Sequence, residues 1–268
     1  MSCLGKKIKG INMKVLQITQ QDGILILRLN RPEKHNCLNQ DLITALDAAI
    51  SEAETNSSLY GVLIIGNGPS FCAGADINKL AECNALSGYE FAQLGQKLMN
   101  RIESLSKPCV AALHGHVLGG GCELAMAAHL RFAHEKTQLG QPEIKLGVIP
   151  GYGGTQRLTR LVGRSQALDL CLTGRFVTAE QALSLGLIDR IYGDDLEHQA
   201  LEYLQQFKQL PAIAIASILK TIVQGNDMPI EPALELEALH FAKTCASLDK
   251  AEGVQAFLAK RRANFKGC

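Results

Sequence analysis

The chain has 268 residues and a mass of 28.9 kDa, which suits one large domain or two small ones. Hydrophobic residues make up 47% of it and charged residues 20%, a balance that excludes disordered, collagen-like and coiled-coil chains. The formal net charge is +1, tryptophan is absent and aromatic residues are 5%, so we expect no binding to nucleic acid or to a membrane surface.

The N-terminal sequence MSCLGKKIKGIN lacks the apolar segment of a signal peptide. We expect residues 1–12 to be a poorly ordered extension, and the protein to be cytoplasmic, or in the mitochondrial matrix if it is eukaryotic. The nine cysteines are odd in number and form no C-x-x-C pair. This pattern favours reduced cysteines over disulfides or a metal site.

Strand and helix patterns alternate in the first half of the chain. Two β-rich runs, Val15–Thr19 and Ile24–Leu29, flank Gln-Gln-Asp-Gly and predict a hairpin. Asn39 is a candidate N-cap for a helix whose apolar residues recur with 3.6-residue spacing. The other elements predicted here are strands at Gly61–Gly66 and Val110–Leu113, a helix at about Tyr89–Leu105 and a helix that begins after Gly119-Gly-Gly121.

The β-rich runs stop near Asp195, and helical patterns follow. Capping-box sequences at Thr178–Gln181 and Asp249–Glu252 indicate two helix starts. We therefore predict an α/β protein with an α/β core over residues 13–194 and a helical region over residues 195–268. The four helices predicted in that region are Leu196–Leu210, Ala212–Gly225, Ile230–Ala246 and Asp249–Arg262.

Several common catalytic motifs are absent from the sequence. Gly66-Asn-Gly68 is followed by Phe71 where a dinucleotide-binding fingerprint needs a third glycine. The sequence contains no P-loop, no G-x-S-x-G, no H-E-x-x-H and no EF-hand loop. The paired ligands of a zinc site are also missing, so no metal is expected.

Two glycine-rich segments are candidates for an oxyanion hole. Phe71–Asp76 follows a buried strand, and Gly119–Gly121 opens a helix. Small residues let a ligand approach backbone N–H groups, and two such loops could each donate one N–H to a single oxygen. The alternative is that these glycines only permit tight turns and close helix packing.

Two glutamates are candidates for acid–base chemistry. Glu123 lies in the first turn of an apolar helix, where it could instead merely complement the helix dipole. Glu143 follows Gln-Pro and could instead be an exposed loop acid. Their spacing does not show whether the two side chains meet.

Three motifs together resemble the crotonase (enoyl-CoA hydratase/isomerase) superfamily, and within it enoyl-CoA hydratase most closely. They are Phe71-Cys-Ala-Gly-Ala-Asp-Ile, His116-Val-Leu-Gly-Gly-Gly-Cys-Glu-Leu-Ala-Met, and Leu139-Gly-Gln-Pro-Glu-Ile continuing to Pro150-Gly-Tyr-Gly-Gly-Thr-Gln-Arg-Leu. The resemblance extends from about residue 15 to the C-terminal segment. It implies a crotonase-like spiral of ββα and βα turns, and a C-terminal helical trimerisation region that builds a homotrimer or a homohexamer (a dimer of trimers).

The resemblance also implies roles for individual residues. The substrate is an acyl-CoA thioester, and no cofactor is needed because CoA is part of the substrate. Glu123 is implied as the base and Glu143 as the acid, with the backbone N–H groups of Ala75 and Gly120 as oxyanion donors. Asn78 replaces a lysine common at its position. The implied substrate contacts are Lys34, Ala75, Asp76, Ile77, Asn78, Gly120 and Gly151, together with Phe257 and Lys260, which often serve a neighbouring subunit.

The activity implied is the addition of water across the 2-trans double bond of an enoyl-CoA. Two alternatives stay open: a double-bond isomerase, which often needs only one carboxylate, and a non-catalytic CoA- or RNA-binding homologue. The presence of both Glu123 and Glu143 favours hydration.

Overall fold

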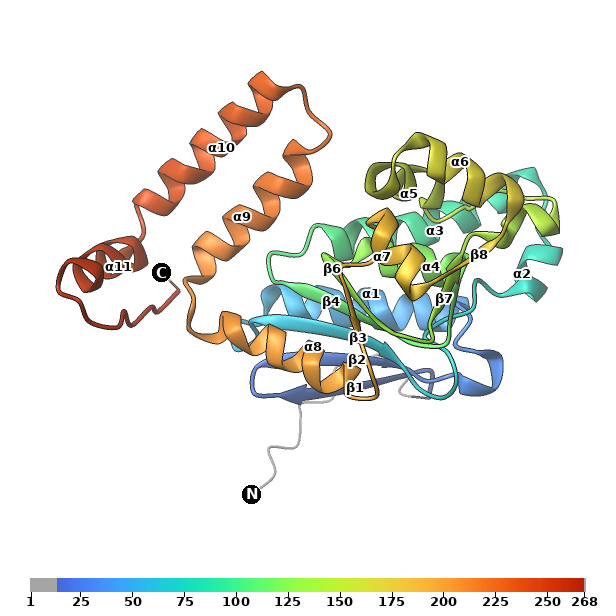
Figure 1. Ribbon diagram of the computed structural model, residues 1–268, viewed down its shortest axis with the longest axis horizontal. Coiled ribbons are helices and arrows are strands. Elements are labelled where there is room, and N and C mark those ends of the chain that lie inside the picture. Colours follow the sequence, from blue (N-terminus) through green and yellow to red (C-terminus); the bar gives the residue numbers. More distant parts are fainter. Residues whose placement is uncertain (1–13, 268) are drawn as a thin grey trace.

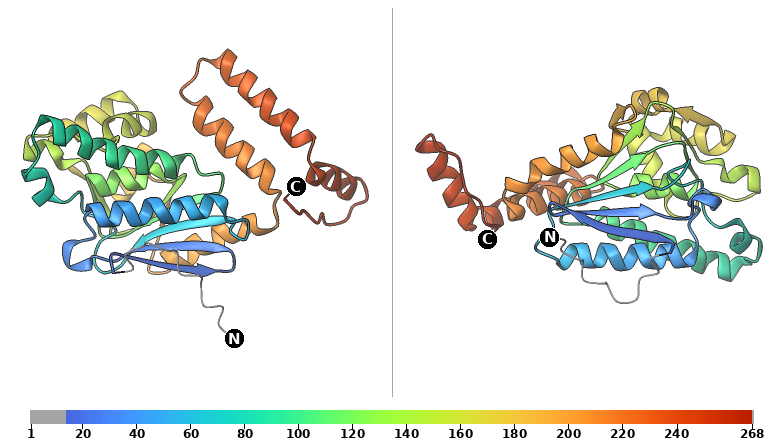
Figure 2. Two further views of the ribbon diagram at one scale, coloured as in Figure 1. Left: turned by 180° about the vertical axis from the view of Figure 1, so that it is seen from behind. Right: turned by 90° about the horizontal axis from the view of Figure 1, so that it is seen from below.

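The computed structural model describes residues 14–267 as an α/β body from which an arm of helices projects (Figure 1 and Figure 2). The predicted extension, residues 1–12, lies outside the described residues. The division of the chain into a core and a helical region stays a prediction.

A six-stranded sheet forms the centre of the body. Its antiparallel hairpin turns at Asp22 and Gly23, which both have positive φ angles of 50° and 88°, as a tight hairpin turn requires. All other strand pairs in this sheet are parallel. The strand order is β1 (Leu16–Gln21), β2 (Ile24–Leu29), β3 (Gly61–Gly66), β4 (Cys109–Leu113), β6 (Leu130–His134) and β9 (Arg190–Tyr192).

Helices cover both faces of this sheet. On one face lie α1 (Gln40–Thr55), α3 (Ala85–Glu103) and α4 (Gly120–Ala127), and on the other lies α8 (Leu196–Gln205). Each face of the sheet carries its own hydrophobic core, and alternate residues of β2 point into the two cores. Leu27 packs in the core under α1, α3 and α4, whereas Ile26 packs in the core under α8. The body therefore continues beyond β9 into α8.

A second, three-stranded sheet supports the α4 end of the body. Its strands have only three residues each, too few for a periodic pattern, and the sequence did not predict them as strands. They are β5 (His116–Leu118), β7 (Gln138–Gly140) and β8 (Phe176–Thr178), accompanied by α2 (Ile77–Ala81), α5 (Gly154–Val162), α6 (Arg164–Thr173) and α7 (Ala179–Leu185).

The arm consists of α9 (Ala212–Gly225), α10 (Ile230–Cys245) and α11 (Leu248–Leu258). These helices stand clear of the sheet in all three views (Figure 1 and Figure 2). The arm leaves large apolar side chains exposed, among them Ile222 at 66% and Phe241 at 69%.

Some helix boundaries differ from the prediction for local reasons. Helix α3 begins at Ala85 rather than Tyr89 because Asn84 and Ser87 form a capping box. The capping box predicted at Thr178 is confirmed, whereas the one predicted at Asp249 is wrong. Ser247 caps α11 instead, and the Asp249 carboxylate accepts the backbone N–H groups of residues 266 and 267.

Candidate active site

A largely apolar cavity of about 970 Å³ opens where α2, α3 and the start of α4 meet the 142–156 segment. Its lining includes most of the residues that the sequence implicated in chemistry. These are Ala75, Ile77, Gly120, Glu123, Glu143 and Gly151.

Ala75 and Gly120 come from different loops, and their backbones lie against each other. A Cβ placed on Gly120 would be 3.2 Å from the Ala75 nitrogen, so a side chain at residue 120 would crowd the Ala75 N–H group. Gly119, with φ of 50°, turns the chain into α4 and leaves the Gly120 N–H at the first helical position. Within residues 14–267 neither N–H has a protein acceptor.

Glu123 is buried beside these donors, with 2% of its surface exposed. Its Oε1 accepts hydrogen bonds from the backbone N–H groups of Tyr152 at 2.7 Å and Gly154 at 2.6 Å. Tyr152 belongs to the turn that precedes α5, and Gly154 is the first residue of that helix. The turn therefore fixes one carboxylate oxygen of Glu123 and leaves the other available to the cavity.

Glu143 approaches the same cavity from the 3-10 helix Pro142–Leu146. A Cβ on Gly119 would lie 2.7 Å from its Oε1, so its carboxyl group rests on the backbone that leads into α4. The buried Gln141 amide faces Glu143, and the hydrogen-bond network assigns its nitrogen to donate to both carboxylate oxygens at 3.1 Å.

Both carboxyl groups bind their protons more tightly than exposed glutamates do. Burial raises the pKa of Glu123 to about 8, and the Glu143 charge adds to the rise. The two N–H donors and the Arg157 guanidinium oppose this increase. Burial likewise raises the pKa of Glu143, to about 7. Between these values the pair holds a single proton, which is the state that acid–base catalysis by two carboxyl groups requires.

Five of the implied substrate contacts do not line the cavity. Asp76 accepts the Asn78 N–H at 3.1 Å and so caps α2, while Lys34 and Asn78 are exposed. Phe257, 83% exposed, and Lys260 belong to the arm segment. Figure 1 shows α11 at the opposite end of the molecule from α2, so these two residues cannot reach this cavity within one chain.

Sequence patterns did not indicate the residues that hold the glutamates. They are the turn residues Tyr152 and Gly154, and Gln141 beside Glu143. The only sequence feature that pointed to this support was the set of glycines at 151, 153 and 154, because glycines allow the backbone to approach a carboxylate closely.

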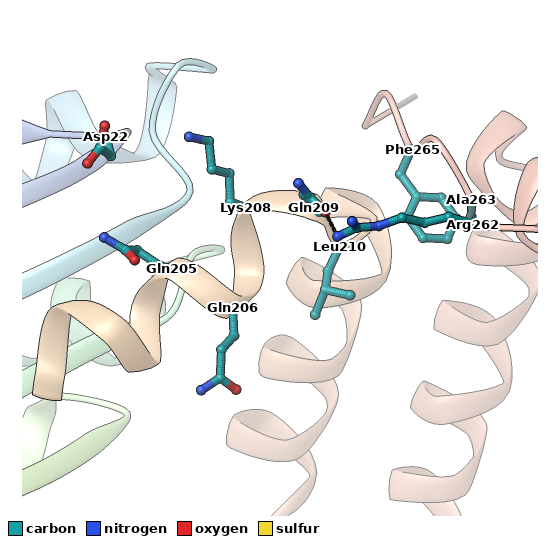
Figure 3. Close-up of a pocket in the computed structure, with 9 residues that line it drawn as sticks. All are labelled: Asp22, Gln205, Gln206, Lys208, Gln209, Leu210, Arg262, Ala263 and Phe265. Atoms are coloured by element: carbon teal, nitrogen blue, oxygen red, sulfur yellow. Dashed lines mark hydrogen bonds between the residues drawn. The ribbon is translucent and has the colours of Figure 1, made fainter.

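A second hollow, of about 660 Å³, lies at the base of the arm (Figure 3). Three glutamines, Lys208 and Arg262 line it, and Arg262 donates to the Gln209 side chain. It contains one carboxylate, Asp22, and no glycine-rich loop. Glu123 and Glu143 line only the first of these two cavities. Across residues 14–267 no cluster of three or more metal-binding side chains occurs, and no helix in that range could cross a bilayer.

Comparison with known proteins agrees with this geometry. A sequence model of the enoyl-CoA hydratase/isomerase family matches residues 19–268. The chain belongs to this family. It is 39% identical to a probable enoyl-CoA hydratase of Bacillus subtilis over 95% of this chain and all of that protein. It is 37% identical to a short-chain-enoyl-CoA hydratase of Clostridium acetobutylicum, over 91% and 95% of the two chains.

The fold agrees as well. An enoyl-CoA hydratase structure from Geobacillus kaustophilus superimposes with a TM-score of 0.91 at 33% identity, covering 95% of this chain and 97% of that one. The predictions of the family and of a crotonase-like α/β fold with a C-terminal helical region are thereby confirmed.

Proposed function

We propose that this protein adds water across the 2-trans double bond of an enoyl-CoA to give a 3-hydroxyacyl-CoA. The observation that carries the proposal is the pair Glu123 and Glu143, which line one apolar cavity together with Ala75 and Gly120. The hydratase names of its relatives support the same reaction.

The oxyanion donors address the charge that develops during the reaction. Attack of water on C3 moves electrons onto the thioester oxygen, so the transition state resembles an enolate. The N–H groups of Ala75 and Gly120 would hold this oxygen, and losing one such donor typically costs on the order of 10²–10³ in rate. Because these donors are backbone groups, they need no reorganisation during the reaction.

The two glutamates divide the proton transfers. The free oxygen of Glu123 takes a proton from water as the new C3–O bond forms, and Glu143 gives its proton to C2. Because the pKa of Glu123 is the higher of the two, the shared proton of the resting pair favours Glu123 and must move to Glu143 before Glu123 can act as the base. The two N–H groups that stabilise the Glu123 carboxylate favour this transfer. After the step Glu123 holds the proton and Glu143 is ionised, and proton exchange restores the starting state. The substrate brings CoA with it, and the mechanism uses no further cofactor.

Assembly forms part of the same proposal. The arm exposes Ile218, Leu234, Leu239 and Phe257, each more than half accessible, which is unusual for a stable monomer surface. A homotrimer or a homohexamer would cover these side chains. A neighbouring arm could then bring Phe257 and Lys260 to the CoA of another subunit. A cytoplasmic location stays a prediction.

Hydration of crotonyl-CoA, followed as loss of enoyl absorbance, tests the reaction. Glu123→Gln and Glu143→Gln should each lower kcat at least ~10²-fold, the usual contribution of a general acid or base. The double variant should be little worse than the poorer single one, because groups that act as a unit are non-additive. Glu135→Gln, an exposed glutamate beside Lys136, is the matched control.

One experimental outcome would show that the protein catalyses double-bond isomerisation and not hydration. If Glu123→Gln hydrates at the normal rate while 3-enoyl-CoA isomerisation depends only on Glu143, the protein is an isomerase. Circular dichroism of each variant establishes that its fold is intact.

A further inference from the structure

The turn Gly151–Gly154 is the part of the site that orients Glu123. The peptide group between Gly151 and Tyr152 is held at both ends. Its carbonyl accepts the Gln96 side-chain amide at 2.9 Å, and its N–H donates to Glu123. The N–H of Gly154 supplies the second bond to the same oxygen. The position of Glu123 therefore depends on the conformation of this turn.

Arg157 ties the turn to helix α3. Its Nη1 donates to the Tyr152 carbonyl at 3.3 Å, and its Nη2 donates to Asn100 at 2.7 Å. Nε and Nη2 both reach Oε2 of Glu103, at 3.2 and 2.7 Å. Gln96, Asn100 and Glu103 are spaced so that they share one face of α3. The guanidinium thus joins a rigid helix to the turn by several bonds at fixed angles.

The surroundings of Arg157 leave it little freedom. The residue is 8% exposed, and a Cβ on Gly153 would lie 2.4 Å from its Nη1. Gly153, with φ of 107°, is therefore required both by its backbone angle and by the guanidinium beside it. Any shift of Arg157 would be transmitted directly to the turn.

We propose that Arg157 is a positioning residue for the reaction: by fixing the 151–154 turn against α3, it aims two backbone N–H groups at Glu123 and keeps that carboxylate in its working geometry. The proposal rests on the proposed hydration chemistry. Arg157 does not line the cavity, so it acts through Glu123 and not through the substrate. Its positive charge also favours the ionised form of Glu123.

The test replaces Arg157 by Lys and by Met. Lysine keeps the charge but cannot make the forked contacts, whereas methionine removes both. We expect kcat for crotonyl-CoA to fall about tenfold for Arg157→Lys and about 10²-fold for Arg157→Met, because misplacing a catalytic group is costly. KM should change less than about threefold.

The pH profile separates positioning from general loss of structure. The groups around Glu123 are Glu143, Arg157 with its partner Glu103, the Tyr152 phenol and the Cys122 thiol. Of the charged ones only Arg157 is positive, so Arg157→Met should move the alkaline limb of kcat/KM to higher pH. Arg131→Lys is the matched control: Arg131 is 5% exposed and paired with Asp189 at 3.0 Å. It should lower stability without moving that limb.

Two further variants keep the test decisive. In a Glu123→Gln background, Arg157→Lys should cause no further loss of kcat, since the group on which it acts is gone. If Arg157→Met does not fold, Asn100→Ala removes one arginine contact from an exposed position and should lower kcat about two- to fivefold.

The proposal is wrong if folded Arg157→Lys and Arg157→Met keep the wild-type kcat and pH profile, or if the loss multiplies in full with Glu123→Gln. A wild-type protein without hydratase activity contradicts the proposed function instead. Arg157 can then be tested by thermal unfolding alone. The melting temperature should fall with rising pH until the pH passes the pKa of Glu123 in the folded protein, and this end point should lie at a higher pH in Arg157→Met than in the wild type. In a Glu123→Gln background the two proteins should no longer differ in this way.

Discussion

Gly120 and Ala75 lie so close that a side chain on the first would contact the backbone nitrogen of the second, at 3.2 Å. A methyl group at residue 120 would therefore press on the backbone that carries the Ala75 N–H group. This contact is tight but does not involve the interior of the sheet. Adding one methyl group should disturb the oxyanion donors more than the fold.

Gly120→Ala should accordingly lower kcat about 10–10²-fold, because the donors are pushed apart and lose their aim at the thioester oxygen. The melting temperature should fall by only a few degrees. Gly193→Ala is the matched control, since no atom lies within 4 Å of the added methyl. Steady-state hydration of crotonyl-CoA and thermal unfolding of both variants check this. A Gly120→Ala enzyme with normal kcat would place the oxyanion hole elsewhere.

The pH dependence of hydration follows from the shared proton of Glu123 and Glu143. Below about pH 7 both carboxyl groups are protonated and no base is available, whereas above about pH 8 both are ionised and no acid remains. The profile of kcat/KM should be a bell with its maximum between these values. A rate that stays flat from pH 5.5 to 9.5 would contradict the shared-proton mechanism.

The raised pKa values of Glu123 and Glu143 also mean that the two buried carboxylates lower the stability of the folded protein at neutral and alkaline pH. A glutamate whose pKa is raised in the folded state stabilises the fold fully below its ordinary pKa of 4.5. That contribution is lost as the pH rises to about 7 for Glu143 and to about 8 for Glu123. Glu123→Gln keeps an oxygen for the two N–H groups but carries no charge. It should raise the free energy of unfolding by about 2 kcal/mol or more at pH 9.

Denaturant unfolding at pH 5 and pH 9 measures this effect. The gain of Glu123→Gln over wild type should shrink markedly at pH 5, where both proteins bury a neutral group. An equal gain at the two pH values would mean that the raised pKa is not its cause.

The sequence predicted residues that line the cavity better than it predicted the residues that hold them. Glu123, Ala75 and Gly120 all line the cavity and lie in motifs that are local in the chain, so the order of these motifs was sufficient to single them out. Arg157 and Gln96 act through contacts between α3 and the turn before α5. No periodicity reports such a contact, because it depends on how two helices pack. The Asp249 carboxylate shows the same limit, since its partners follow the helix that it was expected to cap.

Cys122, next to Glu123, should not take part in the reaction. Burial, together with the charges of Glu143 and Glu123, raises the pKa of its thiol well above the usual range, so no reactive thiolate forms near neutral pH. Cys122→Ala should hydrate crotonyl-CoA with kcat within about threefold of wild type, at some loss of stability from the small cavity. A loss of about 10³-fold with an intact fold would reveal a nucleophile.

The arm is expected to hold the subunits together, because many of its large apolar side chains stay exposed in a single chain. Truncation after Leu210 removes α9, α10 and α11, and should leave a protein that no longer forms trimers or hexamers. Light scattering of the full and truncated chains measures this. The double change Leu239→Asp and Phe241→Asp, at side chains 62% and 69% exposed, keeps the arm and should also dissociate the assembly. If either altered protein stays a stable oligomer, subunits associate through the body instead, and the arm has another partner.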